Sequence, residues 1–189
     1  MSDVSSGSGK VVVNRAMSLD GFIAGPGHEM DWIFEYLTAD TFPEVMAATG
    51  AMLVGRGTYE VAKRMADRDT AYDGGPQFVL THAPPDEPDP TVTFLTCGIE
   101  EAVATARGAA GGKNLEILGA DVAAQCLRRG LVDEILVYVL PVLLGDGVRF
   151  SPPTLGRIDL EPFSTTRSGA VTMLRFRVRK HPAVPAGRE

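Results

Sequence analysis

Residues 52–60 of the sequence read MLVGRGTYE, an apolar segment that passes through Gly55, Arg56 and Gly57 into a predicted helix starting at Thr58. Glycines at a strand-to-helix junction let the backbone approach a ligand, and the free N–H groups of the first helical turn attract an anion. The guanidinium of Arg56 adds a permanent charge with a geometry suited to phosphate. A tight turn with a solvated Arg56 would explain the same residues, so this segment alone leaves both interpretations open.

A second junction of this kind lies at residues 117–122, ILGADV, where a predicted strand passes through Gly119 and Ala120 into a helix that Asp121 is expected to cap. The carboxylate of Asp121 would stabilise the helix but repel a phosphate unless its side chain turns away. Ligands of open α/β sheets bind at the carboxyl ends of strands. Two glycine junctions at such ends therefore favour one extended dinucleotide, although the usual G-x-G-x-x-G fingerprint is absent.

Strand-like and helix-like segments alternate along the rest of the chain. Strands are expected at residues 11–16, 51–55, 77–81, 91–95, 115–118 and 132–140, and helices at residues 41–49, 58–65, 99–107 and 121–129. Thr41 and Glu44 predict a capping box for the first helix. The alternation favours one three-layer α/β/α domain with a mainly parallel central sheet. We expect it to span residues 10–180, between disordered tails at residues 1–9 and 181–189.

The C-terminal segment has a different period. Leu174, Phe176 and Val178 alternate with arginines, which is typical of a half-exposed antiparallel strand, and Ser168-Gly169 is a plausible hairpin turn before it. We therefore expect an antiparallel C-terminal edge on the sheet. Because exposed edges are normally covered, and because residues 140–144 add apolar surface, we also expect a homodimer.

Composition excludes several classes of protein. The net charge of -6 is opposite to that of a nucleic-acid-binding surface. No apolar run approaches the ~18 residues of a membrane span. Two cysteines cannot form a disulfide scaffold, so we expect a cytoplasmic protein. The histidines His28, His82 and His181 have no metal-ligand spacing, so no metal site is expected.

Other polar residues follow predicted strands. Thr81 and His82 could meet an adenosine ribose or its 2′-phosphate, or could cap a loop in solvent. Ser18 and Asp20 come just past the first strand, where a site would open, although Asp20 and the glycine after it could form a simple turn. Trp32 belongs to a segment that fits the core as well as a pocket wall.

Four segments in this order and spacing, MSLDGFIAGPGHEMDW, MLVGRGTYE, ILGADVAAQCLRRGLVDEI and LPVLLGDGVRF, resemble the dihydrofolate-reductase-like superfamily. Within it they are similar to the reductase domain of the bifunctional riboflavin-biosynthesis deaminase-reductase. The resemblance covers about residues 10–180. It implies a three-layer fold with a mostly parallel sheet, NADPH as hydride donor and a small-molecule substrate.

The resemblance also implies roles for individual residues. The phosphates would be held by Gly55, Arg56, Gly57 and Thr58 and by Gly119, Ala120, Asp121 and Val122, the adenosine would lie by Thr81 and His82, the nicotinamide by Ala16 and Ile23, and the substrate by Trp32, Leu144 and Gly145. Asp20, with Ser18 beside it, is the candidate catalytic residue. It would orient the substrate or relay a proton, unless a bound water delivers that proton.

Three positions depart from the family pattern. Leu37 stands where dihydrofolate reductases carry a carboxylate, and Phe22 where the riboflavin reductases carry a basic residue. Gly119-Ala120 replaces a pair of glycines joined by a cis bond, so we expect a trans or strained bond there.

The hypothesis that fits these residues is an NADPH-dependent reductase of a small heterocyclic or carbonyl substrate, similar to the 5-amino-6-(5-phosphoribosylamino)uracil reductase of riboflavin biosynthesis. The alternatives are a non-catalytic NADPH- or ligand-binding protein of the same fold, a dihydrofolate reductase and a structural subunit of an assembly.

Overall fold

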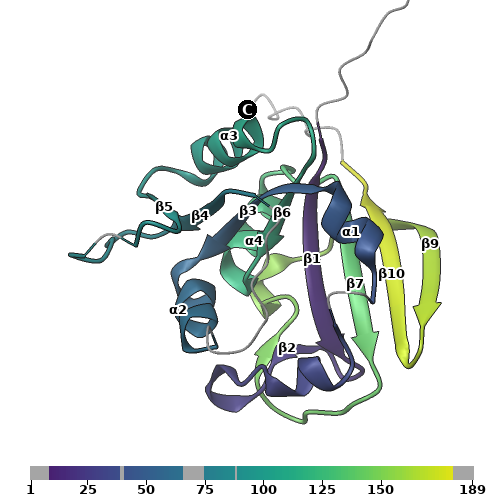
Figure 1. Cartoon of the computed structure of the whole chain (residues 1–189). Coiled ribbons are helices and arrows are strands. Elements are labelled where there is room, and N and C mark those ends of the chain that lie inside the picture. The colour runs from purple at the N-terminus through teal and green to yellow at the C-terminus, as the bar shows by residue number, and fades with distance from the viewer. Residues whose placement is uncertain (1–8, 39–40, 66–74, 88, 181–189) are drawn as a thin grey trace, which may run out of the picture.

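The computed structural model describes residues 9–38, 41–65, 75–87 and 89–180 (Figure 1). The tails predicted at residues 1–9 and 181–189 lie outside the described residues except for Gly9. A Cβ atom on Gly9 would overlap the carbonyl of Lys113, so this residue packs against the domain. Gly9 therefore belongs with the domain, one residue before the boundary that the sequence predicted.

One large sheet forms the centre of the domain, with the strand order β5-β4-β3-β6-β1-β7-β10-β9. In chain order its strands are β1 (Val11–Ser18), β3 (Thr49–Gly55), β4 (Gln77–Leu80), β5 (Thr93–Leu95), β6 (Asn114–Leu118), β7 (Glu134–Leu140), β9 (Leu160–Ser168) and β10 (Val171–Val178). The strands from β5 through β7 are all parallel, whereas β10 is antiparallel to β7 and β9 to β10. The mainly parallel sheet with an antiparallel edge is confirmed.

Helices cover both faces of this sheet. Alternate side chains of a strand point to opposite faces, so Val11 and Val13 of β1 join a core cluster with α3 (Ile99–Ala109) and α4 (Ala120–Arg128). Val12 joins the cluster on the other face, which includes Val45 of α1 (Pro43–Ala48). In Figure 1, α1 lies in front of the sheet and α4 behind it. The three-layer prediction is therefore confirmed.

Helix starts differ from the sequence predictions. The capping box at Thr41 and Glu44 is wrong, because α1 begins at Pro43 after Phe42 and no side chain caps it. Proline at the first helical position needs no partner for its nitrogen, and the Thr41 hydroxyl accepts the Thr38 N–H at 2.9 Å instead. Helix α2 (Arg56–Arg64) begins two residues before the predicted start.

The C-terminal hairpin turns at residues 169–170, where it was expected. The strand that contains Leu174 and Phe176 is not the sheet margin, however, because β9 pairs along its outer side. The antiparallel margin of the sheet is therefore β9, on which Phe163 is 37% exposed.

The homodimer stays a prediction, now placed on β9 because an unpaired strand edge is open to a second copy. Light scattering at micromolar concentration should give twice the 20.1 kDa of one chain. A mass of one chain would show that β9 is protected by its own charged side chains.

A second, two-stranded sheet lies at the carboxyl end of β1. It pairs β2 (Phe22–Ala24) with β8 (Val148–Arg149) in antiparallel fashion. The short 3-10 helices η1 (Pro26–His28), η2 (Asp31–Glu35) and η3 (Pro153–Leu155) complete the described elements. Gly147 lets the chain pass β2 closely, because a Cβ atom there would lie 2.1 Å from the carbonyl oxygen of Ala24. No pattern in the sequence indicated this small sheet.

Candidate functional site

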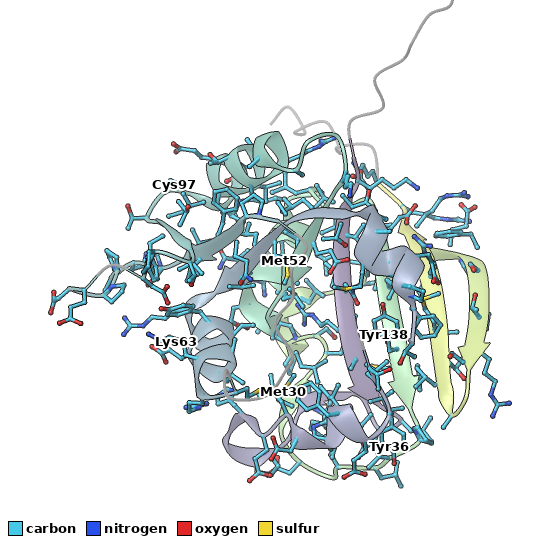
Figure 2. All side chains as sticks on the ribbon, viewed as in Figure 1. Met30, Tyr36, Met52, Lys63, Cys97 and Tyr138 are labelled. Atoms are coloured by element: carbon cyan, nitrogen blue, oxygen red, sulfur yellow. The ribbon has the colours of Figure 1, made fainter. Side chains whose placement is uncertain are left out.

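A cavity of about 750 Å³ opens along the carboxyl ends of the parallel strands. Its described walls come from β1, β2, α2, the ends of β4 and β6, the start of α3 and one face of α4. Met30 and Cys97 both line it, and Figure 2 shows them well apart, one near η2 and the other near α3. The cavity is therefore elongated, with room for a ligand of several connected parts.

The two glycine junctions predicted from the sequence pack directly on each other in one wall of this cavity. Gly119 has φ of +93°, and a Cβ atom on it would lie 2.6 Å from Thr58 Oγ1. A Cβ atom on Gly55 would lie 3.1 Å from a methyl carbon of Val122. The junctions therefore form one continuous surface, and side chains on these glycines would displace it. The peptide bond between Gly119 and Ala120 is trans.

Both helices that start in this wall have glycine at their N-cap, Gly55 for α2 and Gly119 for α4, and no side chain caps either one. The prediction that Asp121 caps α4 is wrong, since Asp121 lies within its first turn. A glycine cap leaves the first N–H groups of a helix without a side-chain acceptor. Two helix starts with open donors thus face one cavity, an arrangement suited to phosphate groups.

At one end of the cavity, Arg56, Thr81 and His82 lie together, with Arg56 and Thr81 bonded to the same carbonyl group. The Arg56 side chain is 55% exposed, and its Nε donates to Glu60 at 2.7 Å while a terminal nitrogen donates to the carbonyl of Ala83 at 3.1 Å. The buried Thr81 hydroxyl hydrogen-bonds with the same carbonyl at 3.2 Å. An exposed Arg56 can move to a ligand anion, because a surface ion pair such as the one with Glu60 is weak.

Arg56→Ala should weaken NADPH binding about 10-fold and NADH binding much less, because the guanidinium lies beside Thr81 and His82, which are expected to meet the 2′-phosphate that only NADPH carries. Fluorescence titration of both nucleotides measures the two constants. Glu60→Ala is the matched control, since it frees Arg56 without removing its charge. Equal loss of both affinities would place Arg56 away from the 2′-phosphate.

At the other end, Ala16 and Ile23 line the cavity. Asn14 lines it beside them, and its amide donates to Glu116 Oε2 at 3.0 Å. The Thr49 hydroxyl donates to the other oxygen of Glu116 at 2.5 Å. Burial raises the pKa of Glu116. This carboxyl group lies behind the cavity wall and holds the side chain of Asn14 in place.

Asp20 does not line the cavity. Its carboxylate accepts hydrogen bonds from the Ser18 hydroxyl at 2.6 Å and from the backbone N–H groups of Leu144 and Gly145 at 3.1 and 2.8 Å. These bonds, that of Ser18 first, lower the pKa of Asp20 to about 2. Gly21 after it has φ of +92°, so the Asp-Gly turn is also present. The carboxylate thus anchors the loop at residues 143–147 to the end of β1.

The predicted substrate residues also lie outside the described cavity wall. Trp32 packs on the core cluster around α1, and its indole N–H donates to the carbonyl of Glu29 at 3.2 Å. Leu144 and Gly145 present their N–H groups to Asp20 rather than to the cavity. Val148, a few residues further on, lines the cavity instead.

Several cavity residues were not predicted from the sequence. The start of α3 contributes Gly98 and Glu100, α4 contributes Gln125, and Arg129 follows directly after α4. Arg129 forms an ion pair of 2.6 Å with Glu100. The spacing of four between Asp121, Gln125 and Arg129 could have revealed this face of α4, because residues four apart lie on one side of a helix.

The most notable of the missed residues is Arg15, which is 5% exposed and lines the cavity from β1. Its two terminal nitrogens donate to the carbonyl of Phe150, at 3.1 Å, and to that of Gly119. Burial lowers its pKa to about 10, and Asp121 opposes this shift. Arg15 therefore remains charged at neutral pH. The single charged residue within β1 was the available signal.

Two further properties concern the described residues only. Nowhere among them do three His, Cys, Asp or Glu side chains gather closely enough to hold a metal ion. Their helices include none with the length and apolar character needed to cross a membrane.

The sheet order, the paired glycine helix starts and the elongated cavity define a protein of the dihydrofolate-reductase-like class. Over residues 9–174 the chain matches the RibD C-terminal domain family. The chain belongs to this family.

Relatives and solved structures agree with this assignment. The uncharacterized protein YwjB of Bacillus subtilis (strain 168) is 26% identical over 169 residues, which cover 88% of this chain and 97% of YwjB. The deaminase/5-amino-6-(5-phosphoribosylamino)uracil reductase of Thermotoga maritima superposes with a TM-score of 0.65 at 18% identity, over 93% of this chain and 58% of that one. Enterococcus faecalis dihydrofolate reductase, complexed with NADP(H), superposes with a TM-score of 0.62 at 17% identity, over 92% and 98% of the two chains. These structures share the fold with the present chain.

Proposed function

We propose that this protein is an NADPH-dependent reductase that transfers a hydride to a small heterocyclic or carbonyl substrate, as in the uracil reductase step of riboflavin biosynthesis. The observation that carries the proposal is the contact between Gly119 and Thr58, which joins two uncapped helix starts in one cavity wall. Family membership supports it independently, because the Thermotoga maritima relative of this fold is named a reductase.

The cavity residues fit a dinucleotide from end to end. The starts of α2 and α4 would bind the phosphates, Thr81 and His82 the adenosine, and Ala16 and Ile23 the nicotinamide. The bound cofactor would supply the hydride. The protein would contribute position and exclusion of water, the usual contributions of a protein to cofactor chemistry.

Reduction of the substrate also requires a proton. At the nicotinamide end, the described cavity wall has no carboxylate that could deliver it. The acidic residues in the described cavity wall are Glu100 and Asp121, and these lie at the start of α3 and in the first turn of α4. Asp20 is bound to the loop at residues 143–147. We therefore assign proton delivery to water, with the Asn14 amide orienting the substrate.

The test is NADPH binding and NADPH oxidation by the purified protein against a panel of pterins, pyrimidines and quinones. A reductase consumes NADPH with at least one member of the panel. Binding without consumption would favour the ligand-binding alternative, reduction of dihydrofolate would favour a dihydrofolate reductase, and no binding would favour a structural subunit.

A further inference from the structure

Arg15 is a buried cation that forms no direct ion pair among the described residues. None of the ion pairs among the described residues includes it. Its terminal nitrogens bond only neutral carbonyl groups, and its Nε has no partner within the described part of the chain. Burying an unpaired charge is costly. A residue of this kind at a cavity wall indicates that an anion completes its surroundings.

The position of Arg15 connects it to the start of α4. The carbonyl of Gly119 accepts both its guanidinium and the N–H of Ala123 at 3.2 Å. In a trans peptide the carbonyl and the following N–H point in opposite directions, so the N–H of Ala120 points away from the bond with Arg15. Arg15 thus fixes the orientation of the peptide group with which the helix begins.

At the start of α4, the negative charge of Asp121 and the positive charge of Arg15 oppose each other. Asp121 is the acidic residue in the first turn of α4, and it would repel a phosphate bound to the open N–H groups there. Asp121 and Arg15 interact electrostatically. The positive charge of Arg15, behind the helix start, is therefore placed to offset the negative charge of Asp121.

We propose that Arg15 is a positioning residue for the diphosphate of a dinucleotide, which it serves by holding the Gly119 peptide and by offsetting the charge of Asp121. The inference rests on the proposed function for the identity of the ligand. The inference adds a third component to the proposed phosphate site. Besides the two helix starts, β1 contributes a buried positive charge.

Arg15→Met and Arg15→Lys separate charge from structure, because both break the bonds to the two carbonyls and only the lysine keeps the charge. Binding of inorganic pyrophosphate and of NADPH is measured by titration calorimetry, and stability by thermal unfolding. Arg15→Met should weaken both ligands about 10-fold or more, whereas Arg15→Lys, which keeps the charge but not the two carbonyl bonds, should recover only part of the lost affinity at a similarly reduced stability. Equal affinities in the methionine and lysine variants would overturn the offset of the Asp121 charge, and a wild-type affinity in the lysine variant would overturn the role of the two carbonyl bonds.

Two further variants keep the test decisive even where Arg15→Met does not fold. Asp121→Asn, at an exposed position, should tighten pyrophosphate binding about threefold, and an unchanged affinity would overturn the proposed offset. Arg175→Met is the matched control, since Arg175 of β10 also has an unpartnered buried Nε but bonds Glu134 at 3.4 Å. It lies outside the described cavity wall and should leave both affinities unchanged.

The outcomes distinguish this inference from the proposed function. If the wild-type protein binds NADPH and Arg15→Met binds it equally well, only the inference fails. If pyrophosphate binding depends on Arg15 but NADPH is never oxidised, the inference holds and the reductase assignment fails. If the wild-type protein binds neither ligand, both fail.

Discussion

Gly119→Ala is expected to abolish most nucleotide binding, with an NADPH dissociation constant raised about 100-fold. The new methyl group would meet Thr58 Oγ1 at 2.6 Å, and the backbone at φ of +93° would be strained by roughly 1–2 kcal/mol. Both effects move the helix starts that would bind phosphate, and misplacing binding groups by about 1 Å can cost 100-fold. Fluorescence titration measures the affinity, and thermal unfolding should show a midpoint several degrees lower.

Gly108→Ala is the matched control for this substitution. Gly108 lies in α3 and outside the described cavity wall, and a Cβ atom added to it would meet nothing within 4 Å. Alanine is favoured over glycine within a helix by roughly 1 kcal/mol, so this variant should be as stable as the wild type or more so. A Gly119→Ala protein that binds NADPH within threefold of the wild type would remove the structural basis of the proposed function.

Asp20→Asn should lower kcat/KM for any accepted substrate by about 100-fold at every pH between 5 and 8. An asparagine has one acceptor oxygen where the carboxylate accepts three donors, and its amide N–H groups would oppose the N–H groups of Leu144 and Gly145. The loop at residues 143–147 would then leave the end of β1, with a loss typical of a misplaced positioning group. NADPH affinity should change little, because Asp20 does not line the cavity.

The pH dependence identifies which role Asp20 has. Its pKa in the folded protein, about 2, is below the ordinary value of 3.8, so its bonds stabilise the folded loop fully above pH 4 and lose this effect as the pH falls toward 2. A group ionised throughout the neutral range is a poor general acid. Asp20→Asn could instead remove one limb of the plot of kcat/KM against pH. That result would show that Asp20 transfers a proton. Asp146→Asn is the control, since Asp146 of the same loop accepts only the N–H of Gly147.

The sequence predicted the sheet, the layers and the two glycine junctions at strand ends because the signals for these features are local. Gly55 and Gly119 mark the ends of strands within a few residues of sequence, and the run of apolar residues in β7 identifies a covered strand. That the two glycine junctions touch could not be read from either one. The expectation that both junctions face one ligand came only from the general position of ligands in parallel sheets.

The rest could not be predicted because it depends on partners far along the chain. Asp20 bonds N–H groups 124 and 125 residues away, and Arg15 bonds carbonyls 104 and 135 residues away. No pattern around either residue encodes such distances. Trp32 was equally compatible with core and pocket from its spacing, and the position of α1 decides for the core.

The central place of β1 also determines the order of events on the ribosome. Val11 pairs with Leu115, and Val12 pairs with Glu134, so β1 has no neighbour in the sheet until β6 and β7 are made. At about 5–20 residues per second, roughly 10 s of synthesis separates β1 from these partners. During that time Val11, Val12 and Val13 form an apolar segment exposed to other chains. A nascent chain that stalls before residue 114 therefore lacks both neighbours of β1, and we expect it to aggregate instead of forming a smaller stable sheet.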